Sequence, residues 1–440
     1  MMKAFQDRNI RASILLGLAL LVALVATLRF RSQWVEEPLY PSPHLTEVRM
    51  LSEYHPPLEG TPLDTELYFF DSGVPGGTLL ICGGNHPNEP AGYLASVFFL
   101  ENIQMTEGRA IVMPRMNKGG FLHTESQEAQ LQRFRIPTPH GEREFRHGSR
   151  VTSPVLQWPD PTVYVNPRGI FWDEIVQDHP EMTVGNPGPG QQTLAGIDSR
   201  NVNRVFPGHP RGTITEQLAY AIVELIRQEE VNLAVDYHEA APEYPTNNVI
   251  VAHERAADVA TWAELLLAGD NIGISTDTSA INLRGLTHRE WGDADPGVLP
   301  VLLEAPNVAQ GRLKGRTTEE QIVEGRDLAY ERVQMIQTQL NERLAERARR
   351  LEERGRTPRE RSRRILYVRI PEGGIHIDVR TARHVQTTMR LVESYNDQMA
   401  GPPIGVASIP HYDEIVANGT GYYLHGPEGE PPAGSNGEEN

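Results

Sequence analysis

Apolar residues change their spacing in the first quarter of the chain, and the change predicts a strand followed by a helix. Thr78–Cys82 is a short apolar run bounded by glycines, which is typical of a strand covered on both faces. Apolar residues then recur at helical spacing after Pro90, a residue suited to the first turn of a helix. His86 and Glu89 lie between these two elements, at the carboxyl end of the predicted strand. Open α/β folds bind their ligands at this position.

Short apolar runs that end in polar residues recur further along the chain. His238 directly follows one such run and Glu304 follows another. Strands that alternate with helices in this way predict an α/β fold, with a mainly parallel mixed sheet flanked by helices. The predicted strands are Leu67–Phe70 (expected to form a hairpin with Thr78–Cys82), Arg109–Pro114, Asn232–Tyr237 and Val298–Leu303, and a helix is predicted at about Thr213–Glu229.

The last third of the chain carries a different pattern. Thr317–Leu351 has an apolar stripe that predicts one long amphipathic helix, with Thr317 and Glu320 as a capping box. The arginine-rich stretch that follows, up to Arg364, is expected to be a solvated linker. A small α+β appendage is predicted after it, with strands at Ile365–Ile370 and Ile375–Val379, a helix from about Thr381 and a hairpin turning at Asn418-Gly419.

An uncharged run from Ala12 to Leu28, flanked by basic residues, predicts a membrane-spanning helix or a secretory signal. No small-x-small cleavage site follows it and Arg29 comes at once, which favours an uncleaved anchor. The basic residues on both sides orient the helix only weakly. We expect the large domain behind this anchor to lie outside the cytoplasm, in a periplasmic or extracellular space.

Residues 121–196 are rich in Pro, Gly, His and Arg and show little periodicity. We expect an insertion that either holds small strands or walls the active site. Its histidines, His123, His140, His147 and His179, are expected to be polar surface groups. The predicted segments are 1–11 (cytoplasmic N-terminus), 12–28 (anchor or signal), 29–56 (linker), 57–316 (main domain, with 121–196 as its insertion), 317–364 (long helix and basic linker), 365–425 (appendage) and 426–440 (disordered tail).

Composition narrows the classes of function. The 440-residue chain has a formal net charge of −17 at pH 7, which argues against nucleic acid as a partner. Its single cysteine, Cys82, forms neither an internal disulfide nor a cysteine metal cluster and is expected to be a buried core residue. The sequence has no Gly-x-Ser-x-Gly motif of serine hydrolases and no Gly-x-x-x-x-Gly-Lys loop of nucleotide hydrolases.

Candidate chemistry lies at the predicted strand ends. An imidazole and a carboxylate three residues apart, such as His86 and Glu89, can share a divalent metal, although an isolated pair is weak evidence. The other strand ends add His238 and Glu304. Two histidines and one glutamate leave an open position on zinc, as in hydrolytic sites, and a further carboxylate can act as general base. Asp236 shares a strand face with His238 and is expected to orient its imidazole.

Four motifs in this order resemble the succinylglutamate desuccinylase/aspartoacylase family, within the larger group of zinc carboxypeptidases. They are GGNHPNEPAG, NVNRVFPG, VDYHE and LLEAP, and together they cover roughly Leu67 to Arg312. The resemblance implies a zinc carboxypeptidase-like fold and one Zn²⁺ per chain. The site residues that it implies are His86, Glu89 and His238 as zinc ligands, Glu304 as general base and acid, and Asn203 with Arg204 as binders of a substrate carboxylate.

The sequence departs from the family pattern at several points. The family usually has Asp at the position of Asn201, and the arginine that normally precedes its Asn-Arg motif has no match here. Arg200 and Arg115 are the candidates to polarise the scissile carbonyl. The insertion and the membrane anchor also differ from the cytosolic members of the family.

The combined pattern predicts a zinc metallohydrolase that cleaves an amide bond next to a free carboxylate. Its substrate would be a small peptide, as for a metallocarboxypeptidase, or an N-acyl amino acid, as for a deacylase. The alternative is a catalytically inactive, membrane-tethered binding or scaffolding domain that keeps the fold. The intact set of metal ligands and the base, Glu304, argue against that alternative.

Overall fold

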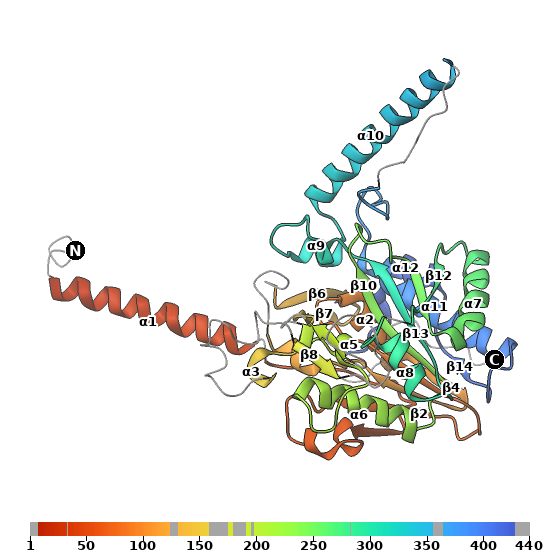
Figure 1. The fold of residues 1–440 in the computed structure, drawn as a ribbon. Coiled ribbons are helices and arrows are strands. Elements are labelled where there is room, and N and C mark those ends of the chain that lie inside the picture. The colour runs from red at the N-terminus through yellow and green to blue at the C-terminus, as the bar shows by residue number, and fades with distance from the viewer. Residues whose placement is uncertain are drawn as a thin grey trace. The chain divides into compact units, whose positions relative to one another are not determined.

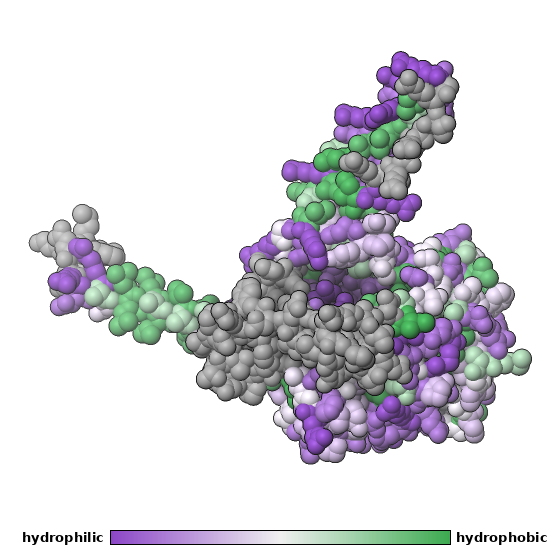
Figure 2. Space-filling model, in the orientation of Figure 1, coloured by the Kyte–Doolittle hydropathy of each residue, from purple (hydrophilic) through white to green (hydrophobic). Residues whose placement is uncertain are grey.

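The computed structural model describes residues 8–32, 34–123, 131–157, 175–178, 191–194, 198–281, 283–354 and 364–426. The chain forms two compact units, Met1–Pro38 and Leu39–Asn440. The first unit contains helix α1 (Arg8–Ser32), whose apolar side chains are exposed (Figure 2). Within the described ranges, α1 is the one helix that is long and apolar enough to cross a membrane, a property that it shares with signal sequences.

The second unit is organised around an eight-stranded mixed sheet (Figure 1). Its strand order is β1-β2-β5-β3-β10-β13-β11-β12, and the four central strands, from β5 to β13, run parallel. The predicted α/β fold with a mainly parallel mixed sheet is therefore confirmed. The strands are β1 (Glu47–Met50), β2 (Glu66–Asp71), β3 (Thr78–Cys82), β5 (Arg109–Met113), β10 (Leu233–Ala240), β11 (Val249–Ala252), β12 (Ser275–Thr278) and β13 (Leu299–Pro306).

Two predictions about the start of this sheet are wrong. The predicted hairpin of Leu67–Phe70 with Thr78–Cys82 does not form, because β5 lies between β2 and β3 and pairs with both. The intervening strand, β5, comes after the helix that follows β3, so β2 and β3 each pair with a strand that is not their neighbour in sequence. The predicted linker 29–56 contains β1, which pairs with β2, and its residue Leu51 is buried. Burial of that segment against the sheet edge makes it part of the fold.

Helices cover both faces of the sheet. On one face, residues of α2, α7 and α11 form a buried cluster with Ile81, Val235 and Leu303 of the central strands. On the other face, residues of α6 and α8 pack with Leu80 and Ala234. The alternation of buried residues along the central strands produces these two layers. The helices are α2 (Pro90–Asn102), α6 (Ile214–Gln228), α7 (Ala257–Gly269), α8 (Thr287–Ala294) and α11 (Ile377–Asp397).

The predicted long helix at Thr317–Leu351 is two helices, α9 (Glu319–Val323) and α10 (Leu328–Glu352). They are separated at Gly325, which has a left-handed φ of +65°. A Cβ at this position would lie 2.1 Å from the carbonyl oxygen of Ile375, so only glycine fits. The capping box is also one residue later than predicted, with Thr318 and Gln321 in place of Thr317 and Glu320.

The C-terminal part differs from the predicted appendage. The strands expected at Ile365–Ile370 and Ile375–Val379 do not form, and α11 starts four residues before the predicted Thr381. Side chains of α11 pack in the same buried cluster as the sheet, so this part of the chain belongs to the main fold. The expected hairpin at Asn418-Gly419 is the end of helix α12 (Tyr412–Asn418). Residues 355–363 and 427–440, predicted as linker and tail, lie outside the described residues.

Smaller elements complete the fold, and they include part of the 121–196 insertion. The insertion forms two hairpins where it is described, and Phe134 and Phe145 of the first hairpin pack against Tyr93 of α2. The remaining elements are β4 (Gln104–Glu107) paired with β14 (Gly405–Ala407), β6 (Arg133–Thr138) paired with β7 (Gly141–Arg146), β8 (Ile175–Asp178) paired with β9 (Gln191–Leu194), and the short helices α3 (Pro154–Gln157) and α5 (Val202–Val205).

Candidate functional site

The predicted ligands meet where the strand order changes direction. From β3 the chain continues through α2 and β4 to β5 on one side, and from β10 it continues to β11, which lies beyond β13 on the other side. The carboxyl ends of β3 and β10 therefore form a topological switch point, where open α/β sheets bind ligands. A cavity of about 980 Å³ lies here, and His86, Glu89, His238 and Glu304 line it.

A tight glycine turn directs the first two ligands across the end of β10. A Cβ on Gly83 would lie 2.0 Å from Ser96 Oγ of α2, which leaves no room for a side chain. Gly84 has a φ of +62°, a left-handed conformation that glycine adopts at little cost. The backbone can therefore bend immediately after β3, so that His86 and Glu89 face β10.

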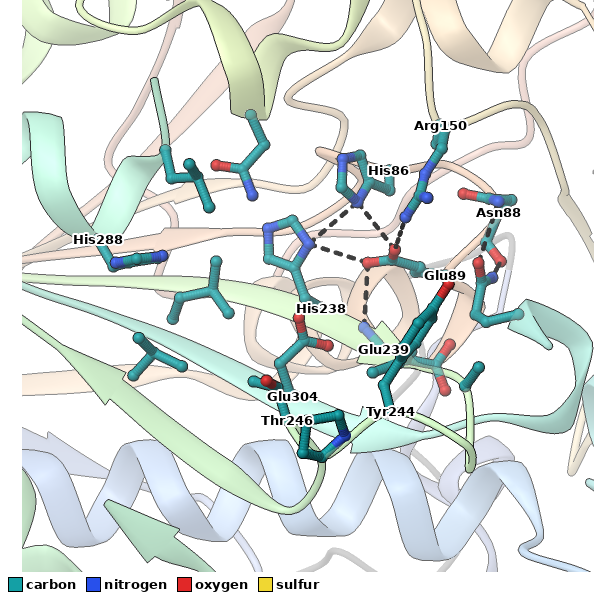
Figure 3. A pocket seen from close by; sticks show the side chains of 18 of the residues that line it. His86, Asn88, Glu89, Arg150, His238, Glu239, Tyr244, Thr246, His288 and Glu304 are labelled. Carbon is teal, nitrogen blue, oxygen red and sulfur yellow. Dashed lines mark hydrogen bonds and ion pairs between the residues drawn. The ribbon is translucent and has the colours of Figure 1, made fainter. Parts of the chain in front are cut away.

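Three side chains form a buried cluster, which we call the metal cluster: His86, Glu89 and His238 (Figure 3). Glu89 contacts both imidazoles, with Oε1 2.8 Å from His86 Nδ1 and Oε2 2.9 Å from His238 Nδ1. The two Nδ1 atoms lie 3.1 Å apart. Two nitrogens and a carboxylate thus point at one small volume, as the sequence predicted.

The opposite nitrogen of each imidazole faces an acceptor. His86 Nε2 lies 2.9 Å from Asn201 Oδ1, and His238 Nε2 lies 2.7 Å from Asp236 Oδ2. Because these partners accept hydrogen bonds, both Nε2 atoms carry hydrogen and both Nδ1 atoms turn lone pairs toward Glu89 and toward each other. Such a set requires positive charge at its centre, and two imidazoles with one carboxylate are a donor set that zinc prefers. The residues present therefore fit a zinc ion.

The electrostatics of the two histidines agree with this requirement. Burial lowers the pKa of His86 to about 4, so this imidazole is neutral at pH 7. Burial acts in the same direction on His238, but the carboxylates of Asp236 and Glu89 outweigh it and raise its pKa above the ordinary value. Without a metal, a proton on His238 supplies the positive charge. A metal ion that binds here takes the place of that proton.

Glu304 lies beside His238 in the neighbouring strand, in direct register with it. Its side chain is half-buried, and its buried Oε2 atom has no hydrogen-bond partner among the described residues. Burial and the negative charge of Glu89 raise the pKa of Glu304 to about 8. A carboxylate with a raised pKa that faces a cavity is suited to accept and return a proton.

Asn203 and Arg204 line the same cavity and belong to α5, the short helix that Asn201 caps. Asn203 Oδ1 accepts a hydrogen bond from Thr287 N at 2.9 Å, and Thr287 Oγ1 donates to Asp236 Oδ2 at 2.7 Å. A continuous chain of hydrogen bonds therefore joins Asn203 to the imidazole of His238. No carboxylate of the described residues forms an ion pair with Arg204, and burial lowers the pKa of its guanidinium.

An arginine that sequence reasoning missed lies at the metal cluster. Arg150, in the insertion, lines the cavity and places Nη2 3.2 Å from Glu89 Oε1. Arg200 does not line the cavity; its Nη1 donates to Thr152 O at 2.8 Å, and Thr152 N donates to Arg200 O at 2.7 Å. Arg200 thus holds the backbone that carries Arg150. Arg115 is buried and does not line the cavity either.

The insertion therefore forms part of the wall of the site where it is described. Of its histidines, His140 is exposed as predicted and His123 is half-buried. His147 is buried, so its prediction as a surface group is wrong: its Nδ1 lies 3.2 Å from the carbonyl oxygen of Leu131. His179 lies outside the described residues. Arg150 is one arginine among many in this segment. No local sequence signal distinguishes it from the others, so it could not have been identified from the sequence.

A buried ion pair links the metal cluster to helix α11. Glu239 Oε2 accepts a hydrogen bond from Ala91 N at 2.9 Å, while Oε1 pairs with Arg380 of α11. The backbone nitrogen of Glu239 donates to Glu89 Oε2 at 3.0 Å. Glu239 thereby fixes the start of α2 against the end of β10, so that Glu89 and His238 keep their mutual position.

Comparison with known proteins adds the following findings. No family model and no curated protein matches the chain. Solved structures that match include a succinylglutamate desuccinylase/aspartoacylase from Rhodobacter sphaeroides, with 18% identity, a TM-score of 0.29 and coverage of 55% of this chain and 51% of that one. A metallo-carboxypeptidase from Burkholderia cenocepacia has 12% identity and a TM-score of 0.34, with 61% and 58% covered.

A third match is the apo form of the cell shape determinant protein Csd4 from Helicobacter pylori, with 10% identity and a TM-score of 0.39. It covers 80% of this chain and 58% of that one. The chain thus spans between half and three fifths of the length of these three structures. The matching structures include the family whose motifs the sequence resembles, together with metallo-carboxypeptidases.

Proposed function

We propose that this chain is a zinc-dependent hydrolase that cleaves an amide bond next to a free carboxylate. The observation that carries the proposal is the convergence of the lone pairs of His86, Glu89 and His238 beside Glu304 in one cavity. A zinc ion held by these three residues would supply Lewis-acid activation of a carbonyl group and of water.

Glu304 is the general base in this proposal. Its carboxylate takes a proton from the attacking water and returns it to the leaving amine, and the positive charge of a bound zinc ion would favour the ionised form of Glu304. Arg150 replaces Arg200 and Arg115 as the candidate that polarises the scissile carbonyl, because it lines the cavity beside Glu89. A guanidinium in a cavity wall stabilises developing negative charge on the carbonyl oxygen.

Arg204 and Asn203 anchor the substrate carboxylate. The guanidinium of Arg204 offers a planar fork that matches a carboxylate bidentately, and no described carboxylate occupies it. Both a C-terminal peptide residue and an N-acyl amino acid present a carboxylate next to the scissile amide. The substrate class is therefore a small peptide or an N-acyl amino acid.

The experiment is a paired assay of free-acid and amidated forms of an N-acyl amino acid and peptide panel. We expect the free acids to be hydrolysed and the amidated forms to lose nearly all turnover. Arg204→Lys keeps the charge but loses the fork, so it should impair kcat/KM by about tenfold or more. Equal rates on both forms would contradict carboxylate anchoring, and no hydrolysis by the zinc-loaded protein would favour a binding or scaffolding role.

We also propose that α1 anchors the protein in a membrane with the catalytic unit on the extracytoplasmic side. The support is the exposed apolar surface of α1 and the absence of a small-x-small site after Leu28. Protease added to cells with a permeabilised outer layer should digest the catalytic unit. Digestion only after lysis of the inner membrane would reverse this topology.

A further inference from the structure

The cavity extends from the metal cluster in two directions. Figure 3 shows His288 and Tyr244 on opposite sides of His238. The Tyr244 side also has Arg312 and Lys314 in its lining, from the loop that follows β13. The His288 side extends over the sheet toward its edge strand β12, and we call this part the side pocket.

The floor of the side pocket follows from the strand register. Leu302 of β13 pairs with Val251 of β11, and Val251 pairs with Asp277 of β12. Paired residues share a sheet face, and Leu302 shares its face with Glu304 two positions later. All three residues line the cavity. Because neighbouring strands lie about 4.8 Å apart, Asp277 lies roughly 10 Å across the sheet from Leu302.

The middle of this floor is apolar and the far end is charged. Val249, Val251 and Leu302 form a buried hydrophobic cluster of their own. Asp277 is exposed to the cavity, and no described residue forms a hydrogen bond or ion pair with its carboxylate. The adjacent Thr276 points to the other face, where its Oγ1 donates to Ala260 O of α7. The floor thus runs from the catalytic carboxylate over aliphatic side chains to a second, unpaired carboxylate.

The wall of the side pocket is joined to the proposed carboxylate anchor. Residues 279–288 supply Leu283, Leu286 and His288 to the lining. This segment is attached to the turn that carries Arg204, because Phe206 N donates to Gly285 O at 3.2 Å. The side pocket therefore begins where the substrate carboxylate would be held, on the amine side of the scissile bond.

The side chains that line the wall are uncharged at pH 7. His288 Nδ1 lies 2.7 Å from Ser279 Oγ, and burial together with the nearby positive charge of His238 lowers the pKa of His288 to about 3. Its imidazole is neutral at pH 7. Between Val251 and His288, the lining contains no lysine or arginine among the described residues. Arg289 lies behind this lining, where its Nη2 donates to Ser279 O at 2.7 Å, but its charge is paired with Glu254 and Asp293. A cation at the far end of the side pocket would therefore be attracted by Asp277.

We propose that the side pocket selects substrates whose amino-acid residue on the amine side of the scissile bond has a straight aliphatic side chain ending in a cation. The methylenes would lie over Leu302 and Val251, and the terminal ammonium or guanidinium would pair with Asp277. This assignment rests on the proposed function, because it takes the scissile bond to lie between Glu304 and Arg204.

The test uses the zinc-loaded full-length protein in detergent and acyl-amino-acid substrates that differ only in their C-terminal residue. Norleucine, lysine and glutamate share an aliphatic stem and differ in terminal charge. We expect kcat/KM for lysine to exceed that for norleucine by about tenfold, the effect of one charge-assisted pair. Asp277→Asn should remove this preference, so that lysine and norleucine are turned over at similar kcat/KM, and Asp277→Arg should favour glutamate.

Asp413→Asn, an exposed carboxylate on α12 outside the cavity, is the matched control and should keep the lysine preference. Equal rates for lysine and norleucine, or a preference that survives Asp277→Asn, would overturn the assignment. A binding measurement tests the side pocket separately from the proposed hydrolase activity. Calorimetry on the zinc-loaded Glu304→Gln variant should show tighter binding of Nα-acetyl-lysine than of Nα-acetyl-norleucine. If lysine binds more tightly but the wild-type protein hydrolyses none of the substrates, the side pocket is supported and the hydrolase activity is refuted. Equal affinities for the two ligands would refute the side pocket.

Discussion

Two groups of histidine and carboxylate side chains in this molecule look alike by residue type. The metal cluster contains His86, Glu89 and His238, and the second group contains His253, Glu254 and Asp293. In both groups the possible ligand atoms lie within 4.8 Å of one another. Residue type and proximity therefore do not separate them.

The difference is the source of positive charge. In the second group, Arg289 pairs with Glu254 at 2.5 Å and with Asp293 at 3.4 Å, and Arg284 pairs with Asp293 at 2.6 Å. The carboxylates are already neutralised by guanidinium groups, and Glu254 is half exposed to solvent. This group is a structural ion-pair network that ties α8 to the segment before α7.

The carboxylate of the metal cluster is less completely neutralised by guanidinium groups. Both imidazoles turn lone pairs inward, and Arg150 approaches only the Oε1 side of Glu89. The comparison indicates that a candidate metal site is recognised by imidazole nitrogens and a carboxylate that converge on one point and are not already neutralised by several guanidinium groups. Counting ligand types alone would have assigned two metal sites.

The largest expected effect separates the two groups directly. His238→Ala should abolish zinc binding because it removes one of three ligands, whereas His253→Ala should leave the zinc content near one per chain. Elemental analysis of the purified, dialysed proteins measures this. Full zinc content in His238→Ala, with a loss in His253→Ala, would exchange the roles of the two groups.

The next effect concerns Glu304, which lies beside the cluster without being a ligand. Glu304→Gln keeps the shape but cannot accept a proton, so zinc should be retained while kcat falls by roughly 10²–10⁴-fold. Parallel measurement of zinc content and turnover tests this. A Glu304→Gln protein with wild-type turnover would show that another group activates the water.

Glu304 should also make the metal-free protein sensitive to pH. Because burial raises its folded pKa to about 8 from an ordinary 4.5, its contribution to stability is fully present below pH 4.5 and is lost as the pH rises through 8. Metal-free Glu304→Gln should therefore be more stable than wild type at pH 9 and about equal at pH 4.5. Urea unfolding at the two pH values measures the difference, and a variant that is less stable at pH 9 would contradict it.

A smaller effect is expected at the hydrogen-bond chain between Asn203 and His238. Thr287→Val keeps the shape and the backbone donor to Asn203 but removes the hydroxyl that contacts Asp236. Partners of ligand imidazoles typically contribute 10–100-fold to metal affinity, so we expect about tenfold weaker zinc binding. Thr287→Ser should restore it in a chelator competition assay. A loss of stability with unchanged zinc affinity would assign Thr287 a structural role only.

Local sequence patterns were sufficient for the parts of the site that sit at strand ends. His86, Glu89, His238 and Glu304 could be predicted because each follows a short apolar run, and parallel strands place such ends side by side. The contact of Asp236 with His238 follows from the two-residue period of a strand. These inferences need only the order of strands and helices.

The remaining features depend on contacts between distant segments. Arg150 reaches the cluster only because the backbone at Thr152 is bonded to Arg200, across 48 positions of the chain. The false hairpin arose because β5 inserts between two strands that are neighbours in sequence. The break at Gly325 is imposed by the close approach of Ile375, which no helical periodicity records.

The buried pair of Glu239 and Arg380 has a consequence for biosynthesis. Arg380 also donates to the carbonyl oxygens of Ile375 and Ile322, so α11 fastens several segments around the end of β10. A ribosome synthesises Arg380 later, 141 residues after Glu239. Until then the carboxylate of Glu239 has no guanidinium partner and the ligands around it are not held together. The metal cluster is therefore expected to assemble only after α11 has been synthesised and has docked against the end of β10.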